Sequence, residues 1–289
     1  MAKQNFTSWA LFILLALVWG SSFILMKKSS EHLTGWQIGS TRIFAAGLLF
    51  LPLAVFHIRK VPLKKLPLVI LSGMLGNLFP AFLFAVAIER MNSSLAGILN
   101  SLTPLFVIVI AILFFKASIE KKKIIGVLIG FTGLVILNIS KGPVAFNDIG
   151  ATLLILLATI MYGFNVNMVG HYLKEVEGLK IATVSMAFIA IPAGIIMWQH
   201  HVVDLFRYDA EAQAAIWLAV LLGIVGSAIA TALFYVLIQK AGGLFASLVT
   251  YAIPVVAIFW GLLNQEDVSV MQVGCLGMIL GGVYLANRG

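Results

Sequence analysis

The chain has 289 residues, of which 61% are hydrophobic and 10% are charged. A soluble domain of this length could not bury so much apolar surface, so the composition excludes an ordinary soluble protein and indicates an integral membrane protein. The formal net charge of +8 could suggest a nucleic-acid partner. The basic residues lie between apolar segments, however, where they would face anionic lipid headgroups, so we expect a lipid bilayer and no nucleic acid as partners.

Transmembrane helices require about 20 mostly apolar residues each. Ten such segments follow one another along the chain: Ser8–Met26, Trp36–Phe56, Leu66–Ile88, Leu95–Phe115, Ile124–Ile139, Ile149–Val169, Ile181–Trp198, Ala214–Ile238, Leu244–Leu263 and Val268–Ala286. They leave almost no sequence for a soluble domain. We therefore predict an all-α, multi-pass integral membrane protein with ten transmembrane helices.

A motif occurs twice, once in each half of the chain. Residues 84–104 (FAVAIERMNSSLAGILNSLTP) align without a gap on residues 234–254 (FYVLIQKAGGLFASLVTYAIP), at an offset of 150. Each copy reads as an apolar helix, a short polar break and a second helix with a proline inside it. Earlier in the halves Trp19 matches Tyr162, and a glycine follows each. The sequence therefore predicts two related repeats, an organisation typical of membrane transporters.

The distribution of lysine and arginine predicts the orientation in the membrane. With the N-terminus inside, the cytoplasmic segments hold 13 of these residues, the outer segments hold five, and only Arg42 lies inside a membrane segment. We therefore expect an inner or plasma membrane protein with both termini in the cytoplasm. Each repeat has five helices, an odd number, so the second repeat (144–289) must be inverted relative to the first (1–143).

Polar and aromatic side chains inside the apolar segments are candidates for a substrate site. Asn77 and Phe84, for example, lie two helical turns apart and share one face. The candidate substrate-binding residues are Trp19, Ser22, Arg42, Asn77, Asn100, Tyr162, Asn165, Ser227, Thr231 and Tyr251. A second interpretation stays open for them, because small and hydroxylated residues also let membrane helices pack closely and asparagines bond between helices.

Arg42 is the single charge well inside a membrane segment, where an arginine costs about 2.5–3.5 kcal/mol. It lies six residues after Trp36, or roughly 9 Å along a helix. At that depth the side chain could reach the outer headgroups. Alternatively it could anchor a carboxylate of the substrate.

Two prolines lie inside predicted helices at equivalent positions of the repeats, Pro104 and Pro254. A proline removes one backbone donor and bends a helix, which frees a carbonyl that needs another partner. We expect these prolines to act as paired hinges.

Several kinds of chemistry have no support in the sequence. No Asp or Glu occurs in the middle of an apolar segment, so gradient-driven efflux is favoured over proton coupling, and Glu89 reads as a solvated loop residue. His200 and His201, with Asp204 nearby, could bind a metal in an outer loop, but no H-E-x-x-H spacing accompanies them. We therefore expect no catalytic residues, no metal site and no cofactor.

Six segments together resemble a known family: WGSSF (19–23), TRIFAAGLLFL (41–51), SSLAGILNSLTPLFVIVIAILFF (93–115), GVLIGFTGLVIL (126–137), FASLVTYAIPVVAIFWGLL (245–263) and GCLGMILGGVYL (274–285). They look like the two EamA-like domains of the drug/metabolite transporter superfamily. The resemblance implies ten helices, cytoplasmic termini and a central cavity between two inverted five-helix repeats. It also implies export of amino acids or other small metabolites.

These observations predict a membrane transporter, and more specifically an exporter of small organic metabolites that works by alternating access of the two repeats. We expect a monomer, with a homodimer as the alternative. The alternative functions are a membrane-embedded enzyme, which would need a buried catalytic set, and a channel or receptor without carrier activity. A channel would need a continuous polar ring rather than scattered polar residues.

Overall fold

The computed structural model describes residues 5–91, 93–139, 148–263 and 269–287, which are helical with short connections. The predicted boundary between the repeats, 143/144, lies outside the described residues. The elements in chain order are α1 (Phe6–Ser29), α2 (Gly35–His57), η1 (Ile58–Lys60), η2 (Leu63–Lys65), α3 (Leu66–Gly73), η3 (Met74–Leu78), α4 (Phe79–Ile88), α5 (Ser93–Asn100), α6 (Thr103–Phe115), α7 (Lys121–Ile139), α8 (Ile149–Tyr172), α9 (Gly178–Gln199), α10 (Val202–Tyr208), α11 (Ala210–Leu221), η4 (Leu222–Ile229), α12 (Ala230–Ala241), α13 (Gly243–Ser247), α14 (Val249–Leu263) and α15 (Val270–Asn287).

Polar residues set where several of these helices begin. The Asn5 side chain accepts a hydrogen bond from the Ser8 amide at the start of α1, and Asp148 does the same for Ala151 at the start of α8. Thr34 and Gln37 form a capping box before α2. Each of these caps satisfies backbone donors that would otherwise be exposed at the membrane surface.

Eight helical stretches among the described residues are long and apolar enough to cross a membrane: Phe6–Ser29, Gly35–Lys60, Leu63–Ile88, Leu95–Phe115, Ile149–Tyr172, Gly178–Gln199, Ala210–Ala241 and Val270–Asn287. A shorter apolar helix covers Gly243–Val256. Helix α7, whose first turn holds three lysines, is not among the eight. The chain is thus a multi-pass membrane protein, and the count of ten spans stays a prediction.

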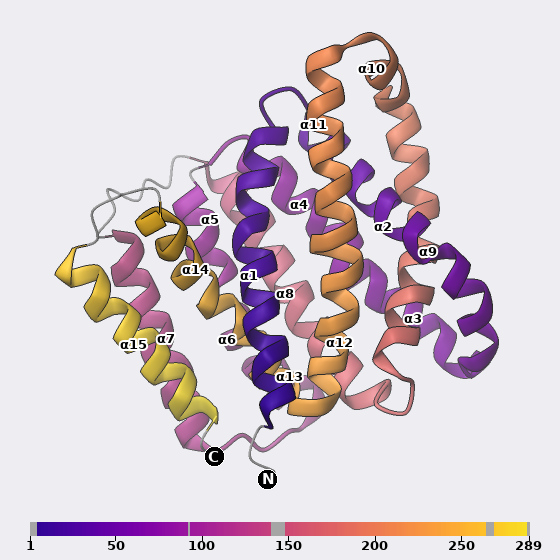
Figure 1. The fold of residues 1–289 in the computed structure, drawn as a ribbon. Helices are drawn as coiled ribbons and strands as arrows, with labels where there is room; N and C mark the ends of the chain where they lie inside the picture. Colours follow the sequence, from indigo (N-terminus) through magenta and orange to yellow (C-terminus); the bar gives the residue numbers. More distant parts are fainter. Residues whose placement is uncertain (1–4, 92, 140–147, 264–268, 288–289) are drawn as a thin grey trace.

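The two halves of the chain run in opposite directions. In Figure 1, α1 begins at the lower end and runs upward, whereas α8 begins at the upper end and runs downward. The start of α1 and the end of α15 lie at the same end of the molecule. The second helices of the halves, α2 and α9, pack along each other, and so do the last helices, α7 and α15.

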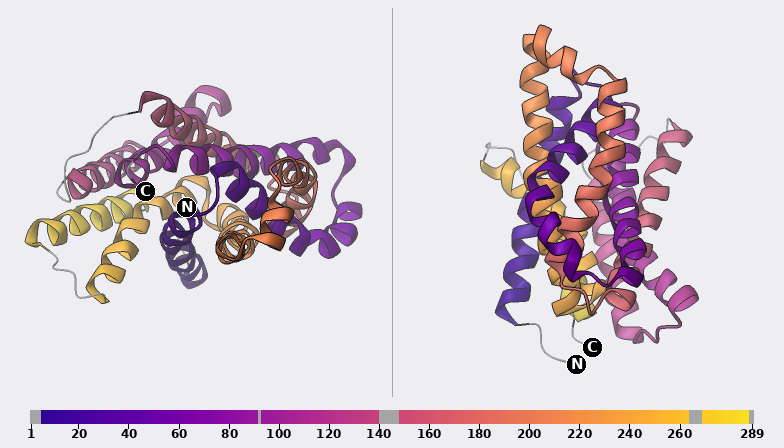
Figure 2. Two further views of the ribbon diagram at one scale, coloured as in Figure 1. Left: turned by 90° about the horizontal axis from the view of Figure 1, so that it is seen from above. Right: turned by 90° about the vertical axis from the view of Figure 1, so that its right-hand side faces the viewer.

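Glycine allows the closest of these contacts. A Cβ atom on Gly282 of α15 would collide with the backbone of Gly126 and Gly130 of α7, and one on Gly47 of α2 would collide with Ala190 of α9. Small residues let membrane helices approach to backbone contact in this way. Figure 2 shows α7 and α15 together at one edge of the bundle, away from α2 and α9.

Two kinds of irregularity recur in both halves. The third helix of each half contains a π-helical stretch, η3 in one and η4 in the other. The fourth helix of each half is interrupted, at residues 101–102 between α5 and α6 and at Leu248 between α13 and α14. The predicted segment Leu95–Phe115 is a candidate membrane span with a turn inside it, and the predicted segment Leu244–Leu263 contains the turn at Leu248.

Candidate functional site

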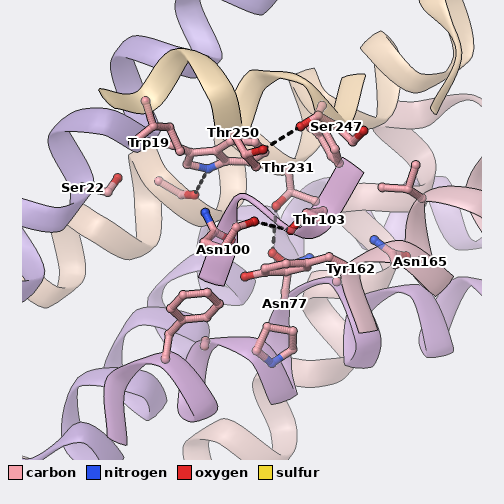
Figure 3. Close-up of a pocket in the computed structure, with 18 of the residues that line it drawn as sticks. Trp19, Ser22, Asn77, Asn100, Thr103, Tyr162, Asn165, Thr231, Ser247 and Thr250 are labelled. Atoms are coloured by element: carbon pink, nitrogen blue, oxygen red, sulfur yellow. Dashed lines mark hydrogen bonds between the residues drawn. The ribbon is translucent and has the colours of Figure 1, made fainter. Parts of the chain in front are cut away.

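A cavity of about 130 Å³ lies between the two halves. Eleven of its lining residues come from each half: Trp19, Ser22, Met26, Arg42, Gly76, Asn77, Pro80, Ala81, Phe84, Asn100 and Thr103 from the first, and Tyr162, Asn165, Val166, Leu222, Gly226, Thr231, Phe234, Tyr235, Ser247, Thr250 and Ile253 from the second. Figure 3 shows the labelled side chains converging from several helices on a common space. We refer to this cavity as the central pocket.

The central pocket is built from equivalent positions of the two repeats. The offset is 143 residues in the first helix of each repeat and 150 in the third and fourth helices. Seven pairs of lining residues correspond in this way: Trp19 and Tyr162, Ser22 and Asn165, Gly76 and Gly226, Ala81 and Thr231, Phe84 and Phe234, Asn100 and Thr250, and Thr103 and Ile253. The pocket therefore lies on the axis that relates the two halves.

Two aromatic pairs connect the halves crosswise. The Trp19 ring of α1 lies 5.1 Å from the Phe234 ring of α12, and the Phe84 ring of α4 lies 6.1 Å from the Tyr162 ring of α8. Each pair joins the first helix of one repeat to the third helix of the other. The indole Nε1 of Trp19 also donates to the Gly226 carbonyl at 3.0 Å, a bond drawn in Figure 3. Relative movement of the halves must change both pairs.

Asn77 bonds across the halves, because its Oδ1 accepts a hydrogen bond from Thr231 Oγ1 at 2.8 Å. Asn165 Nδ2 donates to the Tyr235 hydroxyl at 3.3 Å, which in turn donates to the Ser72 carbonyl at 3.2 Å. Within the described part of the chain, two buried amide atoms keep no hydrogen-bond partner: Asn77 Nδ2, a donor, and Asn165 Oδ1, an acceptor. Buried polar atoms are rarely left unpaired, so each of these two atoms calls for a partner that the described residues do not supply.

Arg42 of α2 is the one charged side chain among the residues that line the pocket. Its Nε donates to Ser227 Oγ of η4. Helix α2 and η4 approach closely at this point, because a Cβ atom on Gly223 would collide with the Arg42 carbonyl. None of the ion pairs between described residues involves Arg42. Its charge therefore faces a pocket that is otherwise neutral.

The helix breaks bring backbone carbonyls and hydroxyls to the pocket wall. Pro104 is the second residue of α6, and the Asn100 carbonyl that it leaves without an amide partner accepts from Thr103 Oγ1 at 2.7 Å. In the other half the Ser247 carbonyl accepts from Thr250 Oγ1 at 3.0 Å. Both bonds are visible in Figure 3. Broken membrane helices of this kind are tolerated where they line a cavity.

Most of the candidate substrate-binding side chains meet in this pocket. Eight of the ten predicted candidates line it: Trp19, Ser22, Arg42, Asn77, Asn100, Tyr162, Asn165 and Thr231. Ser227 does not line it but bonds to Arg42. Tyr251 lies elsewhere: its buried hydroxyl donates to the Val127 carbonyl of α7 at 3.1 Å.

Some lining residues were missing from the predicted set, namely Tyr235, Ser247, Thr250 and Thr103. The π-helical stretches were missed as well. A signal for them exists, because GMLGN (73–77) matches GIVGS (223–227) at the same offset of 150 as the repeat motif. Single π turns inside membrane helices often mark functional sites.

The ends of the third helices are also equivalent. Glu89 Oε1 accepts a hydrogen bond from the Gly35 amide at the start of α2, and Gln239 Oε1 accepts one from the Gly178 amide at the start of α9, at 2.8 Å. Glu89 is exposed, as predicted for a loop residue, but it also caps a helix. The described residues contain no group of three or more His, Cys, Asp or Glu that could hold a metal ion.

Comparison with known proteins gives the family. The EamA-like transporter family matches residues 7–139 and again residues 149–288. The chain belongs to the EamA-like transporter family. This membership, with its match to each half, confirms the resemblance read from the sequence and the two-repeat architecture.

Relatives of this EamA-like transporter carry transporter names. An uncharacterized inner membrane transporter of Escherichia coli (strain K12), YedA, is 29% identical over 95% of this chain and 89% of its own length. An uncharacterized transporter of Archaeoglobus fulgidus is 24% identical over 97% and 98%. The S-adenosylmethionine/S-adenosylhomocysteine transporter of Chlamydia muridarum is 21% identical over 92% and 89%. The chain is thus a membrane transporter of the inner membrane.

A solved crystal structure has the same fold. It covers 96% of this chain and 96% of its own with a TM-score of 0.72, at 18% sequence identity. At that identity the likeness concerns the fold alone.

Proposed function

We propose that this EamA-like transporter exports small organic metabolites, with amino acids as the first class to test, by alternating access of its two repeats. The observation that carries the proposal is the position of the central pocket. Its wall contains seven pairs of equivalent residues, one of each pair from each repeat. A site on the symmetry axis of inverted repeats can face either side of the membrane when one repeat moves against the other.

The contacts between the repeats support such a movement. The crosswise pairs Trp19–Phe234 and Phe84–Tyr162 are equivalent, so closing one end of the pocket while opening the other exchanges their environments. The α2–α9 and α7–α15 contacts lie on opposite sides of the bundle (Figure 1) and are the proposed pivot. Pro104, at the start of α6 after the break, and Pro254, inside α14, are the proposed hinges.

The lining chemistry supports a small polar metabolite rather than an inorganic ion. Amide, hydroxyl and guanidinium groups and aromatic rings all line the cavity. No carboxylate lines it among the described residues, which favours gradient-driven export over proton coupling. The name of the Chlamydia muridarum relative adds S-adenosylmethionine and S-adenosylhomocysteine as a second class to test. We also propose that both termini lie in the cytoplasm.

The test is transport by the purified protein in proteoliposomes. Vesicles are incubated with a mixed metabolite pool, and their contents are measured by mass spectrometry against protein-free vesicles. An accumulated compound is then preloaded, and uptake of its labelled form is followed. Faster uptake into preloaded vesicles is expected of a carrier, whereas uptake that ignores preloading indicates a channel and a chemically altered product indicates an enzyme.

A matched pair of variants tests whether the substrate binds in the central pocket. Thr231→Val removes a pocket hydroxyl that bonds to Asn77. Thr132→Val removes an exposed hydroxyl on α7 that bonds only within its own helix. We expect the first variant to slow transport several-fold and the second to leave it unchanged. Equal transport by both would move the substrate site away from the central pocket.

A further inference from the structure

The charge of the central pocket is unbalanced. Arg42 contributes one positive charge, and its bond to Ser227 uses one of its five N–H donors with a neutral partner. In the described part of the chain no carboxylate lines the pocket or pairs with Arg42. A half-buried charge without a counter-charge is unfavourable, so a bound molecule that supplies one negative charge gains most from this site.

The unpaired amide atoms add polarity to the same space. Asn77 Nδ2 can donate to an anionic or carbonyl oxygen, together with Arg42. Asn165 Oδ1 can accept from an N–H group of the ligand. Asn77 and Asn165 are only 8% and 2% exposed, so neither atom has bulk water as an alternative partner. The pocket therefore favours a ligand that has an anionic oxygen near Asn77 and an N–H group near Asn165.

A fixed positive charge on the ligand would be poorly accommodated. The aromatic rings of Trp19, Phe84 and Tyr162 could attract an ammonium group. The guanidinium of Arg42 repels that group within the same pocket, however, and an amide oxygen such as Asn165 Oδ1 provides only a neutral acceptor. A zwitterion leaves the pocket with a net charge of +1, whereas a monoanion neutralises it.

Resting on the proposed function, we infer that the preferred substrate of this site is an organic monoanion. Its single acidic group binds Arg42 and Asn77 Nδ2, a neutral N–H binds Asn165 Oδ1, and its apolar or aromatic part lies against the crosswise aromatic pairs. N-acylated amino acids have this combination of groups. Free zwitterionic amino acids carry the anionic group but do not neutralise the charge of the site.

Four compounds with one side chain separate these possibilities. Phenylalanine is a zwitterion, N-acetylphenylalanine a monoanion, phenylalaninamide a cation and N-acetylphenylalaninamide neutral at pH 6, where α-amino groups are protonated. Binding is measured by calorimetry on the protein in lipid nanodiscs, and in parallel with the four alanine analogues to separate charge from side-chain size. We expect the monoanion of at least one series to bind about tenfold or more tightly than the other three compounds. Tighter binding of the zwitterion or cation, or no binding of either monoanion, overturns the inference.

Variants of Arg42 test whether its charge causes the preference for the monoanion. Arg42→Gln should abolish the preference for the monoanion and leave binding of the neutral compound unchanged, and Arg42→Lys should retain part of it because a point charge replaces a bidentate fork. Arg207→Gln, at an exposed arginine of α10, is the control and should bind like the parent. Equal weakening of all four compounds by both Arg42 variants would mean that Arg42 only holds α2 to η4, and the inference fails.

The proposed function can survive that failure. If proteoliposomes accumulate free amino acids but not their N-acyl forms, the protein is a metabolite carrier whose substrate is not a monoanion. If they accumulate no compound of either series and none of the metabolite pool, the proposed function itself is wrong.

Discussion

At the scale of single residues, the central pocket depends on side chains that contact the opposite repeat. Trp19 is an example, because its ring packs on Phe234 while its indole N–H bonds to the Gly226 carbonyl. Tyr162 takes the equivalent place in the other repeat and packs on Phe84. Such residues connect substrate binding to the relative position of the repeats, since a ligand that touches the rings also touches the interface.

Removal of these rings should impair transport without unfolding the protein. Aromatic pairs contribute about 0.5–1.5 kcal/mol beyond burial, which corresponds to roughly two- to tenfold in affinity. We expect Trp19→Leu and Tyr162→Leu each to raise the KM for transport by that factor. Trp217→Leu is the control, because Trp217 is 61% exposed on α11. An unchanged KM in both pocket variants would exclude the rings from the binding site.

At the scale of secondary-structure elements, backbone irregularity concentrates around the pocket. The π-helical stretches η3 and η4 and the breaks before α6 and α14 occur at equivalent places in the two repeats. Glycine is required where these elements meet α2 and α9. Gly223 of η4 faces the Arg42 backbone, and Gly73 at the end of α3 lies against Ser185 of α9.

The effect of replacing a glycine on stability and transport should therefore depend on its position. A methyl group at Gly223 would collide with the α2 backbone, whereas one at Gly277 of α15 would meet no atom within 4 Å. We expect Gly223→Ala to lower the thermal unfolding midpoint in detergent by several degrees and to reduce transport. Gly277→Ala should leave both unchanged. A Gly223→Ala protein as stable as the parent would mean that α2 and η4 can separate at no cost.

At the ends of the third helices, replacing the capping glutamate by glutamine should be tolerated, whereas replacing the capping glutamine by glutamate should not. Glu89 uses a single oxygen as an acceptor from Gly35, and a glutamine oxygen can replace it. Gln239 both accepts from Gly178 and donates to the Val176 carbonyl at 2.6 Å, which a carboxylate cannot do. We expect Glu89→Gln to keep stability and transport at pH 6 and pH 8. Gln239→Glu should lower the unfolding midpoint at pH 8, and a pH-dependent loss of transport in Glu89→Gln would instead point to proton coupling through this residue.

At the scale of the whole molecule, the opposite directions of the two repeats place the start of α1 and the end of α15 at one end of the bundle. The segment between α2 and α3, with Lys64, lies at this end, and α10 lies at the other. The excess of basic residues at the end that holds Lys64 predicts that it is cytoplasmic.

Cysteine labelling on intact cells tests this orientation. Cys275 is the single cysteine of the chain and is buried in α15, so a Cys275→Ala background carries no native thiol. In that background we expect an impermeant thiol reagent to label Asp204→Cys and to spare Lys64→Cys until the cells are opened. The reverse pattern would show that the protein has the opposite orientation in the membrane, with both termini outside.

Several features of the protein were determined by the sequence alone. The apolar segments and the basic residues between them specify a multi-pass membrane protein, because lipid admits only backbone that satisfies its own hydrogen bonds. The motif at residues 84–104 and 234–254 specified the repeat, and helical periodicity placed Asn77 and Phe84 on one face. Trp19 and Tyr162 followed from their matching positions, and both line the pocket.

Other features were decided only by the tertiary structure. Tyr235 and Tyr251 are both fully buried, yet Tyr235 lines the pocket whereas Tyr251 bonds to α7. Periodicity shows which residues share a helix face, but it does not show which neighbour that face meets. The same holds for the breaks at residues 101–102 and at Leu248. Their carbonyls accept from hydroxyls on the same segment, Thr103 and Thr250, but a broken membrane helix is tolerated where it lines a cavity, and the cavity exists only in the folded bundle.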